Sequence, residues 1–101
     1  MAYAKQRSAP RIPFPCDVEC PGAGDHPRLS DLSATGAFID SLYDVPEGSR
    51  VKLTFSLPTG IVVSVNAEVA HSMPHFGMGV RFIDLADDQR RAIEQVVAGA
   101  R

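Results

Sequence analysis

Apolar and polar residues alternate strictly along three segments in the middle and second half of the chain. The segments are residues 50–57 (RVKLTFSL), 61–70 (IVVSVNAEVA) and 76–82 (FGMGVRF). Successive side chains of a strand lie on opposite faces of a sheet, so each segment predicts a strand with one buried and one solvated face. In the last segment the inward positions are expected to be Phe76, Met78, Val80 and Phe82.

Shorter strands are predicted in the first half of the chain. Residues 15–20 (PCDVEC) place Cys16, Val18 and Cys20 on one face and two acids on the other. Residues 28–33 (RLSDLS) and 36–41 (GAFIDS) predict two further strands around a break at 34–36. A series of short strands separated by turns is typical of a small antiparallel barrel, in which closure removes exposed edges.

The apolar spacing becomes helical near the end of the chain. Leu85, Ile93, Val96 and Val97 recur at near-helical intervals, and two aspartates at 87 and 88 would lie at the favourable N-terminal end of a helix dipole. We therefore predict an all-β fold with one C-terminal helix at about residues 86–98. This helix is expected to pack on, or near, a mouth of the barrel.

Residues 1–14 are predicted to form a flexible N-terminal arm in front of a barrel domain at 15–101. Pro10, Pro13 and Pro15 lack backbone N–H donors and resist helix formation. Residues 1–11 contain three basic residues and no acid, in a chain whose formal net charge is −2. The basic arm predicts an anionic partner for the arm alone, whereas the net charge argues against a general DNA- or RNA-binding protein.

Length and composition predict one domain located in the cytoplasm. The chain has 101 residues, of which 45% are hydrophobic, and this suits one domain with one core. Its start, MAYAKQRS, lacks the apolar centre of a signal peptide, and no stretch approaches the roughly 20 apolar residues that span a bilayer. We expect a cytoplasmic protein that does not insert into membranes and whose cysteines are reduced.

The candidates for catalysis and metal binding are weak. Cys16 and Cys20 are four residues apart on a predicted strand, so about 13 Å separates their Cα atoms, too far for a disulfide or one tetrahedral metal. His26, Asp31 and Ser33 contain the groups of a catalytic triad, but no nucleophile elbow or glycine-rich oxyanion loop surrounds them. We expect no enzymatic activity, no metal and no cofactor.

Two short motifs carry the candidate chemistry. Arg7 and Arg11 form R-x-x-x-R on the arm, and Asp31, Ser33 and Gly36 form D-x-S-x-x-G. Arginine makes paired hydrogen bonds to phosphate and to the O6/N7 edge of guanine. Glycine can adopt positive φ or let a ligand approach the backbone closely. Taken alone, the second motif is equally compatible with a polar turn between strands, because Asp, Ser and Gly are turn formers.

Together and in this order, the two motifs resemble those of the PilZ family, whose members bind the bacterial second messenger cyclic di-GMP. The resemblance runs from about residue 6 to 97 and includes the segments VPEGSRVKLTFSLP and GMGVRFIDL. It implies a six-stranded antiparallel barrel with a C-terminal helix. It also implies that Arg7, Arg11, Asp31, Ser33 and Gly36 form the ligand site, with Asp31 either accepting from guanine N–H groups or steering an arginine.

The resemblance further implies a receptor without catalysis. Arg81 and Gln6 are secondary candidates for ligand contact, and Gln6 stands where many family members carry another arginine, which favours one ligand per chain over a stacked pair. The signal is expected to pass, through ordering of the arm, to an unidentified effector protein in a process such as motility or biofilm regulation. The alternative is a PilZ-like protein–protein interaction module that does not bind nucleotide.

Overall fold

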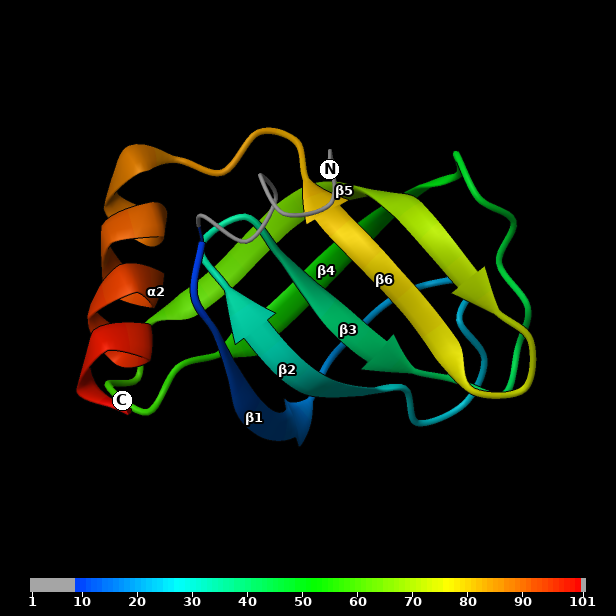
Figure 1. The fold of residues 1–101 in the computed structure, drawn as a ribbon, viewed down its shortest axis with the longest axis horizontal. Helices are drawn as coiled ribbons and strands as arrows, with labels where there is room; N and C mark the ends of the chain where they lie inside the picture. The colour runs from blue at the N-terminus through cyan, green and yellow to red at the C-terminus, as the bar shows by residue number, and fades with distance from the viewer. Residues whose placement is uncertain (1–8, 101) are drawn as a thin grey trace.

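The protein is built on a single antiparallel sheet. The structure is a computed structural model and describes residues 9–100. Its strands, in the order β1-β2-β3-β6-β5-β4 across the sheet, all pair antiparallel with their neighbours (Figure 1). They are β1 (Arg11–Asp17), β2 (Arg28–Ser33), β3 (Gly36–Asp40), β4 (Arg50–Ser56), β5 (Val62–Met73) and β6 (Gly77–Phe82).

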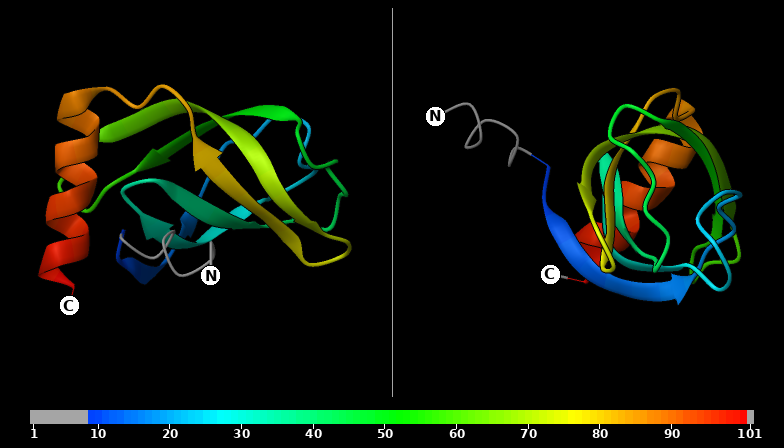
Figure 2. Two further views of the ribbon diagram at one scale, coloured as in Figure 1. Left: turned by 45° about the horizontal axis from the view of Figure 1, so that its top comes forward. Right: turned by 90° about the vertical axis from the view of Figure 1, so that its right-hand side faces the viewer.

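The sheet curls on itself to form a partly closed barrel, as the end-on view in Figure 2 shows. Its two edge strands, β1 and β4, meet beyond the end of β1, where Glu19 forms a bridge with Thr54. The Glu19 N–H donates to the Thr54 carbonyl at 2.9 Å, and the Thr54 N–H donates back at 3.0 Å. The predicted barrel is therefore confirmed, with a seam between β1 and β4 that a short bridge closes.

The predicted alternation places the core correctly in the long strands. The inward residues of β4 and β5 are buried, among them Leu53 and Val63, which are fully inaccessible to solvent. Two inward predictions are wrong. Phe76 lies in the turn before β6 and is 71% exposed, and Ile61 lies in the turn before β5 and is 45% exposed. The backbone N–H of Phe76 donates to the Met73 carbonyl at 2.9 Å, so the turn ends the alternation before this residue.

Strand β1 begins earlier than the sequence predicted. Residues 11–14 fall within the predicted arm but belong to β1, and residues 11–13 pair with β2, so the sheet begins at Arg11. The prolines concealed this strand, because proline cannot donate to a ladder. Here Pro13 and Pro15 lie on an edge strand, and the register shifts between Pro13 and Cys16, where a bulge tolerates the missing N–H.

The predicted C-terminal helix is present as α2 (Asp87–Gly99) and covers one end of the barrel (Figure 1). Its buried face consists of Ala92, Ile93 and Val97. The connection from β6 is held by Asp84, whose carboxylate accepts from the backbone and side-chain N–H groups of Asn66 at 3.2 and 3.0 Å. These hydrogen bonds lower the pKa of Asp84, because they favour the ionised carboxylate.

Both cysteines are free thiols in the structure. Cys16 is half-buried on β1 and Cys20 is buried. Burial raises the pKa of both thiols, because the thiolate is poorly solvated there. Within residues 9–100, His, Cys, Asp and Glu form no group of three or more that could hold a metal ion.

None of the helices formed by residues 9–100 has the length and apolarity needed to cross a bilayer.

Candidate functional site

A hollow of about 840 Å³ lies on the outer side of β3, β6 and β5, beside the start of β1. We call it the arginine groove, because Arg11 and Arg81 both line it. Gly36, Glu68 and Arg81 lie in one row across it, since Arg81 on β6 is the register partner of Gly36 on β3 and of Glu68 on β5. The groove thus brings together three residues that the sequence analysis selected, Arg11, Gly36 and Arg81.

Arg11 and Asp31, one residue from each predicted motif, are in direct contact. Arg11 Nη1 donates to Asp31 Oδ1 at 2.5 Å. The contact crosses from β1 to β2 on the diagonal, because the direct register partner of Arg11 is Ser33. A guanidinium carries five N–H donors, so one contact to Asp31 leaves donors for an anion in the groove. Asp31 was predicted either to accept from guanine or to steer an arginine, and its contact with Arg11 fits the second role.

Ser33 has a local role at the turn between β2 and β3. Its side chain is buried, and its hydroxyl oxygen accepts from the backbone N–H groups of Thr35 at 3.2 Å and Gly36 at 3.1 Å. The hydroxyl also lies 3.3 Å from the Gly36 carbonyl, to which it can donate. These bonds shape the turn, which is the structural explanation that the sequence analysis kept open for this motif.

Gly36 is required by the neighbouring strand rather than by its own backbone conformation. The φ angle of Gly36 is not positive, so this position does not need glycine for its backbone conformation. A Cβ at this position would lie 2.2 Å from the Val80 carbonyl oxygen on β6. The close approach of the β6 backbone therefore gives a structural reason for this glycine, and its contact with a ligand stays a prediction.

The groove contains carboxylates as well as arginines. Arg81 donates to Glu68, with which it forms an ion pair, and Glu47 lines the groove from the loop that precedes β4. His71 on β5 also lines it. Arg81 was a secondary candidate from the sequence, whereas Glu68 and Glu47 were not, because the register that joins these segments is not visible in local patterns.

Two of the predicted site residues, Gln6 and Arg7, lie outside the described residues. Their place relative to the arginine groove stays a prediction. The described part of the chain includes Pro10, which precedes β1 and lines a smaller hollow together with Thr35 and Arg90 of helix α2. Thr35 lines both this smaller hollow and the arginine groove, so the two are neighbours. The start of β1 therefore lies between the arginine groove and helix α2.

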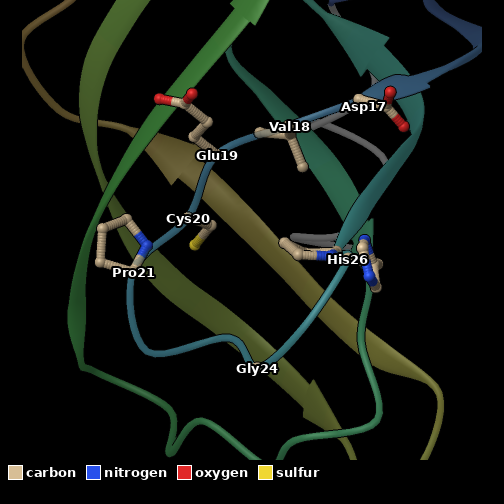
Figure 3. Close-up of a pocket in the computed structure, with 8 residues that line it drawn as sticks. Asp17, Val18, Glu19, Cys20, Pro21, Gly24 and His26 are labelled. Carbon is tan, nitrogen blue, oxygen red and sulfur yellow. The ribbon is translucent and has the colours of Figure 1, made fainter.

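A second hollow, of about 570 Å³, lies under the loop between β1 and β2 (Figure 3). Its lining includes the acids Asp17 and Glu19 together with Cys20 and His26, and no lysine or arginine of residues 9–100. Such a lining does not suit a phosphate-containing ligand, which needs positive charge or N–H donors. The chemistry favours the arginine groove as the candidate site.

The protein is a small antiparallel barrel domain with a C-terminal helix. A basic residue of its first strand, Arg11, lies beside the turn between β2 and β3. The sequence matches the family model of the PilZ domain over residues 5–99. The chain therefore belongs to the PilZ domain family.

Two solved structures show the same fold. One is the Bacillus subtilis inhibitor of motility MotI/DgrA, with a TM-score of 0.84 and 16% identity over 94% of this chain and 50% of that chain. This chain thus spans half the length of MotI/DgrA. The other is the PilZ domain of CeSA from a cellulose-synthesizing bacterium, with a TM-score of 0.64 and 23% identity over 89% of this chain and 96% of that domain. A search of curated protein sequences gave no match.

Proposed function

We propose that this PilZ domain is a receptor for cyclic di-GMP that passes the signal to a partner protein. The observation that supports this most is the arginine groove, where Arg11, oriented by Asp31, and Arg81 border the same hollow beside Gly36. Cyclic di-GMP carries two phosphates and two guanines, and arginine pairs with both kinds of group and stacks on bases. Arg7, on the arm, would add a third guanidinium to the groove.

The ion pairs of the groove are compatible with exchange for a ligand. The side chains of Arg11 and Arg81 are 48% and 66% exposed, respectively. Exposed ion pairs of this kind contribute only about 0–1 kcal/mol. A phosphate that approaches either guanidinium can therefore replace or join the carboxylate without a large loss. Arginine keeps its charge throughout the physiological pH range, so it stays available for such an exchange.

Titration of the purified chain by calorimetry, with cyclic di-GMP and with cyclic di-AMP, tests the proposal. We expect a dissociation constant in the micromolar range for cyclic di-GMP, roughly 8 kcal/mol of binding free energy. We expect weaker binding of cyclic di-AMP, because an arginine of the groove can pair with the O6 and N7 acceptors of guanine, whereas adenine presents an N–H₂ donor in place of O6. Equal affinities for the two dinucleotides would indicate a basic patch that responds only to phosphate, since counterion release does not depend on the base.

We further propose that the arm before β1 becomes ordered when nucleotide binds and that this ordering is the signal. Phosphates would neutralise Arg7 and Arg11 and hold the arm across the groove, and Pro10, with its fixed φ, would limit the entropy lost. The measurement is backbone amide relaxation by NMR. The Gln6 and Arg7 amides should have order parameters below about 0.6 without ligand and near 0.85 with it. High order parameters without ligand would exclude the switch but not binding.

The second candidate is an interaction module that does not use nucleotide. The observation that favours it is the pairing of Arg81 with Glu68 and the presence of Glu47, because these carboxylates offset the positive charge of the groove. Both candidates need a protein partner. The structural neighbours include an inhibitor of motility and a domain from a cellulose-synthesizing bacterium, so regulation of motility or of biofilm formation is the process that we propose.

A further inference from the structure

Four large apolar side chains are strongly exposed at the end of the barrel opposite to α2. They are Leu42 (80% exposed) and Tyr43 (59%), from the loop between β3 and β4, and Met73 (48%) and Phe76 (71%), at the turn between β5 and β6. We call them the distal apolar patch. Figure 1 shows the loop and the turn side by side at the end of the molecule that α2 does not cover, and the left view of Figure 2 agrees.

Hydrogen bonds join the two segments that carry the patch. The Ser41 N–H donates to the Phe76 carbonyl at 3.1 Å, and the His75 N–H donates to Asp44 Oδ1 at 3.2 Å. The buried hydroxyl of Ser41 donates to the Ala23 carbonyl at 2.6 Å and accepts from the Tyr43 N–H at 3.1 Å. The apolar side chains are thus exposed on a backbone that is held in place, which reduces the ordering entropy lost on binding a partner.

The rim of the patch is acidic. The exposed residues Asp25, Asp40, Asp44 and Glu47 belong to the segments that form this end of the barrel. These segments, residues 21–26, 40–49 and 73–77, contain no lysine or arginine. One basic residue adjoins them: Arg28 on β2 is the register partner of Asp40, and its side chain pairs with Asp17. Exposed apolar area that polar residues surround marks interaction sites, and complementary charge determines which partners are accepted.

We propose that the distal apolar patch is a docking surface for a protein segment that presents apolar side chains flanked by lysine or arginine. A second copy of this chain fits less well, because a symmetric contact would bring the acidic rims together. The docked segment would belong to the effector protein to which the domain passes its signal. The proposal rests on the proposed function only in assuming that a partner exists, and it does not depend on nucleotide binding.

The same loop connects the patch to the candidate ligand site. Residues 40–49 carry Leu42 and Tyr43 at one end and Glu47 and Gly48, which line the arginine groove, at the other. Glu47 also accepts from the Ser72 N–H at 3.3 Å, which ties the loop to β5. An anion in the groove would lie near the Glu47 carboxylate, so ligand and partner would both act on this loop.

NMR titration of the ¹⁵N-labelled full chain tests the docking surface. The probes are two amphipathic peptides of about 15 residues, one of leucine and lysine and the other of leucine and glutamate. We expect the leucine–lysine peptide to shift the amides of residues 41–44, 73 and 75–77, and to bind at least about tenfold more tightly than the acidic peptide. Its binding should weaken in about 1 M salt. No binding, equal binding of both peptides, or shifts confined to other surfaces would overturn the proposal.

Variants separate the patch from general stickiness. Leu42→Ser with Phe76→Ser should reduce peptide affinity at least about tenfold, and Asp40→Asn should reduce it through the rim charge alone. Ile61→Ser is the control, because Ile61 is 45% exposed in the turn between β4 and β5, outside the patch. Unchanged peptide affinity in the double variant would contradict the proposal. Sedimentation that showed concentration-dependent dimers, abolished by the double variant, would also contradict it, because the patch would then bind a second copy of the chain.

The same variants distinguish failure of this proposal from failure of the proposed function. The double patch variant should keep its affinity for cyclic di-GMP, and Arg11→Ala should keep its affinity for the leucine–lysine peptide. Thermal unfolding of each variant checks that the fold is intact. Leu42 and Phe76 are 80% and 71% exposed, so we expect Leu42→Ser with Phe76→Ser to cost little stability.

Discussion

Replacing Arg11 with alanine is expected to weaken the binding of cyclic di-GMP by roughly thirtyfold or more. Removal of one partner of a charge pair that the ligand desolvates typically costs about 2–5 kcal/mol. Arg11 lines the arginine groove, and its contact with Asp31 orients the guanidinium. Calorimetric titration of the variant measures the loss, and thermal unfolding measures any accompanying change in stability.

The chain offers a closely matched control for this variant. Arg28 and Asp17 form a second ion pair between β1 and β2, also at 2.5 Å, and the Arg28 side chain is 51% exposed. Arg28→Ala therefore removes one exposed pair between the same two strands, but Arg28 does not line the arginine groove. Both variants should lose at most about 1 kcal/mol of stability, and only Arg11→Ala should lose affinity. If both bind like the wild type, or both lose affinity equally, the groove is not the ligand site.

Replacing Gly36 with alanine is expected to destabilise the protein by about 1–3 kcal/mol or more. The new Cβ would lie 2.2 Å from the Val80 carbonyl oxygen, and this neighbour is backbone in a paired strand. Overpacking of a fitted site forces such backbone shifts at that order of free energy. Denaturant unfolding of the variant gives the change in the free energy of unfolding directly.

Gly79→Ala provides the comparison for Gly36→Ala. Gly79 lies on β6, lines the same groove and has no positive φ, and a Cβ there would meet His71 at an ordinary 3.6 Å. This substitution should be neutral, or stabilise by up to about 1 kcal/mol through the unfolded state. Equal stability of the two variants would show that the approach of β6 does not explain Gly36. A Gly36→Ala protein that kept its stability but lost affinity would instead assign this glycine to the ligand.

The features that the sequence predicted well depend on residues close together along the chain. The alternation in β4 and β5 depends on neighbouring positions, and so does the helical spacing that predicted α2 to within one residue at each end. Predictions weakened where a local signal had two explanations. Pro13 and Pro15 are compatible with a non-helical arm and also with an edge strand that contains a bulge. Only the pairing of β1 with β2 decided between these two structures. Phe76 continued the alternation of β6 but lies in the turn before it.

The candidate site shows the same division at the level of single residues. R-x-x-x-R and D-x-S-x-x-G are local motifs, so the sequence alone identified the family and selected Arg7, Arg11, Asp31, Ser33 and Gly36 as candidates. It could not show that Arg11 contacts Asp31, because twenty positions separate them along the chain. Nor could it show that the Ser33 hydroxyl is engaged in a turn, since this depends on how the backbone bends after β2.

By itself, the sequence determined most of the strands, the helix, the antiparallel barrel and membership of the PilZ family. Each follows from periodicity or motif spacing, which express the geometry of single elements. Only the tertiary structure decided that Glu68 faces Arg81, that the β6 backbone excludes a side chain at Gly36, and that Leu42 and Phe76 lie at one end of the barrel. These outcomes depend on strand register and on turns, which bring distant residues together, and a shift of one residue would send the side chains to the other face.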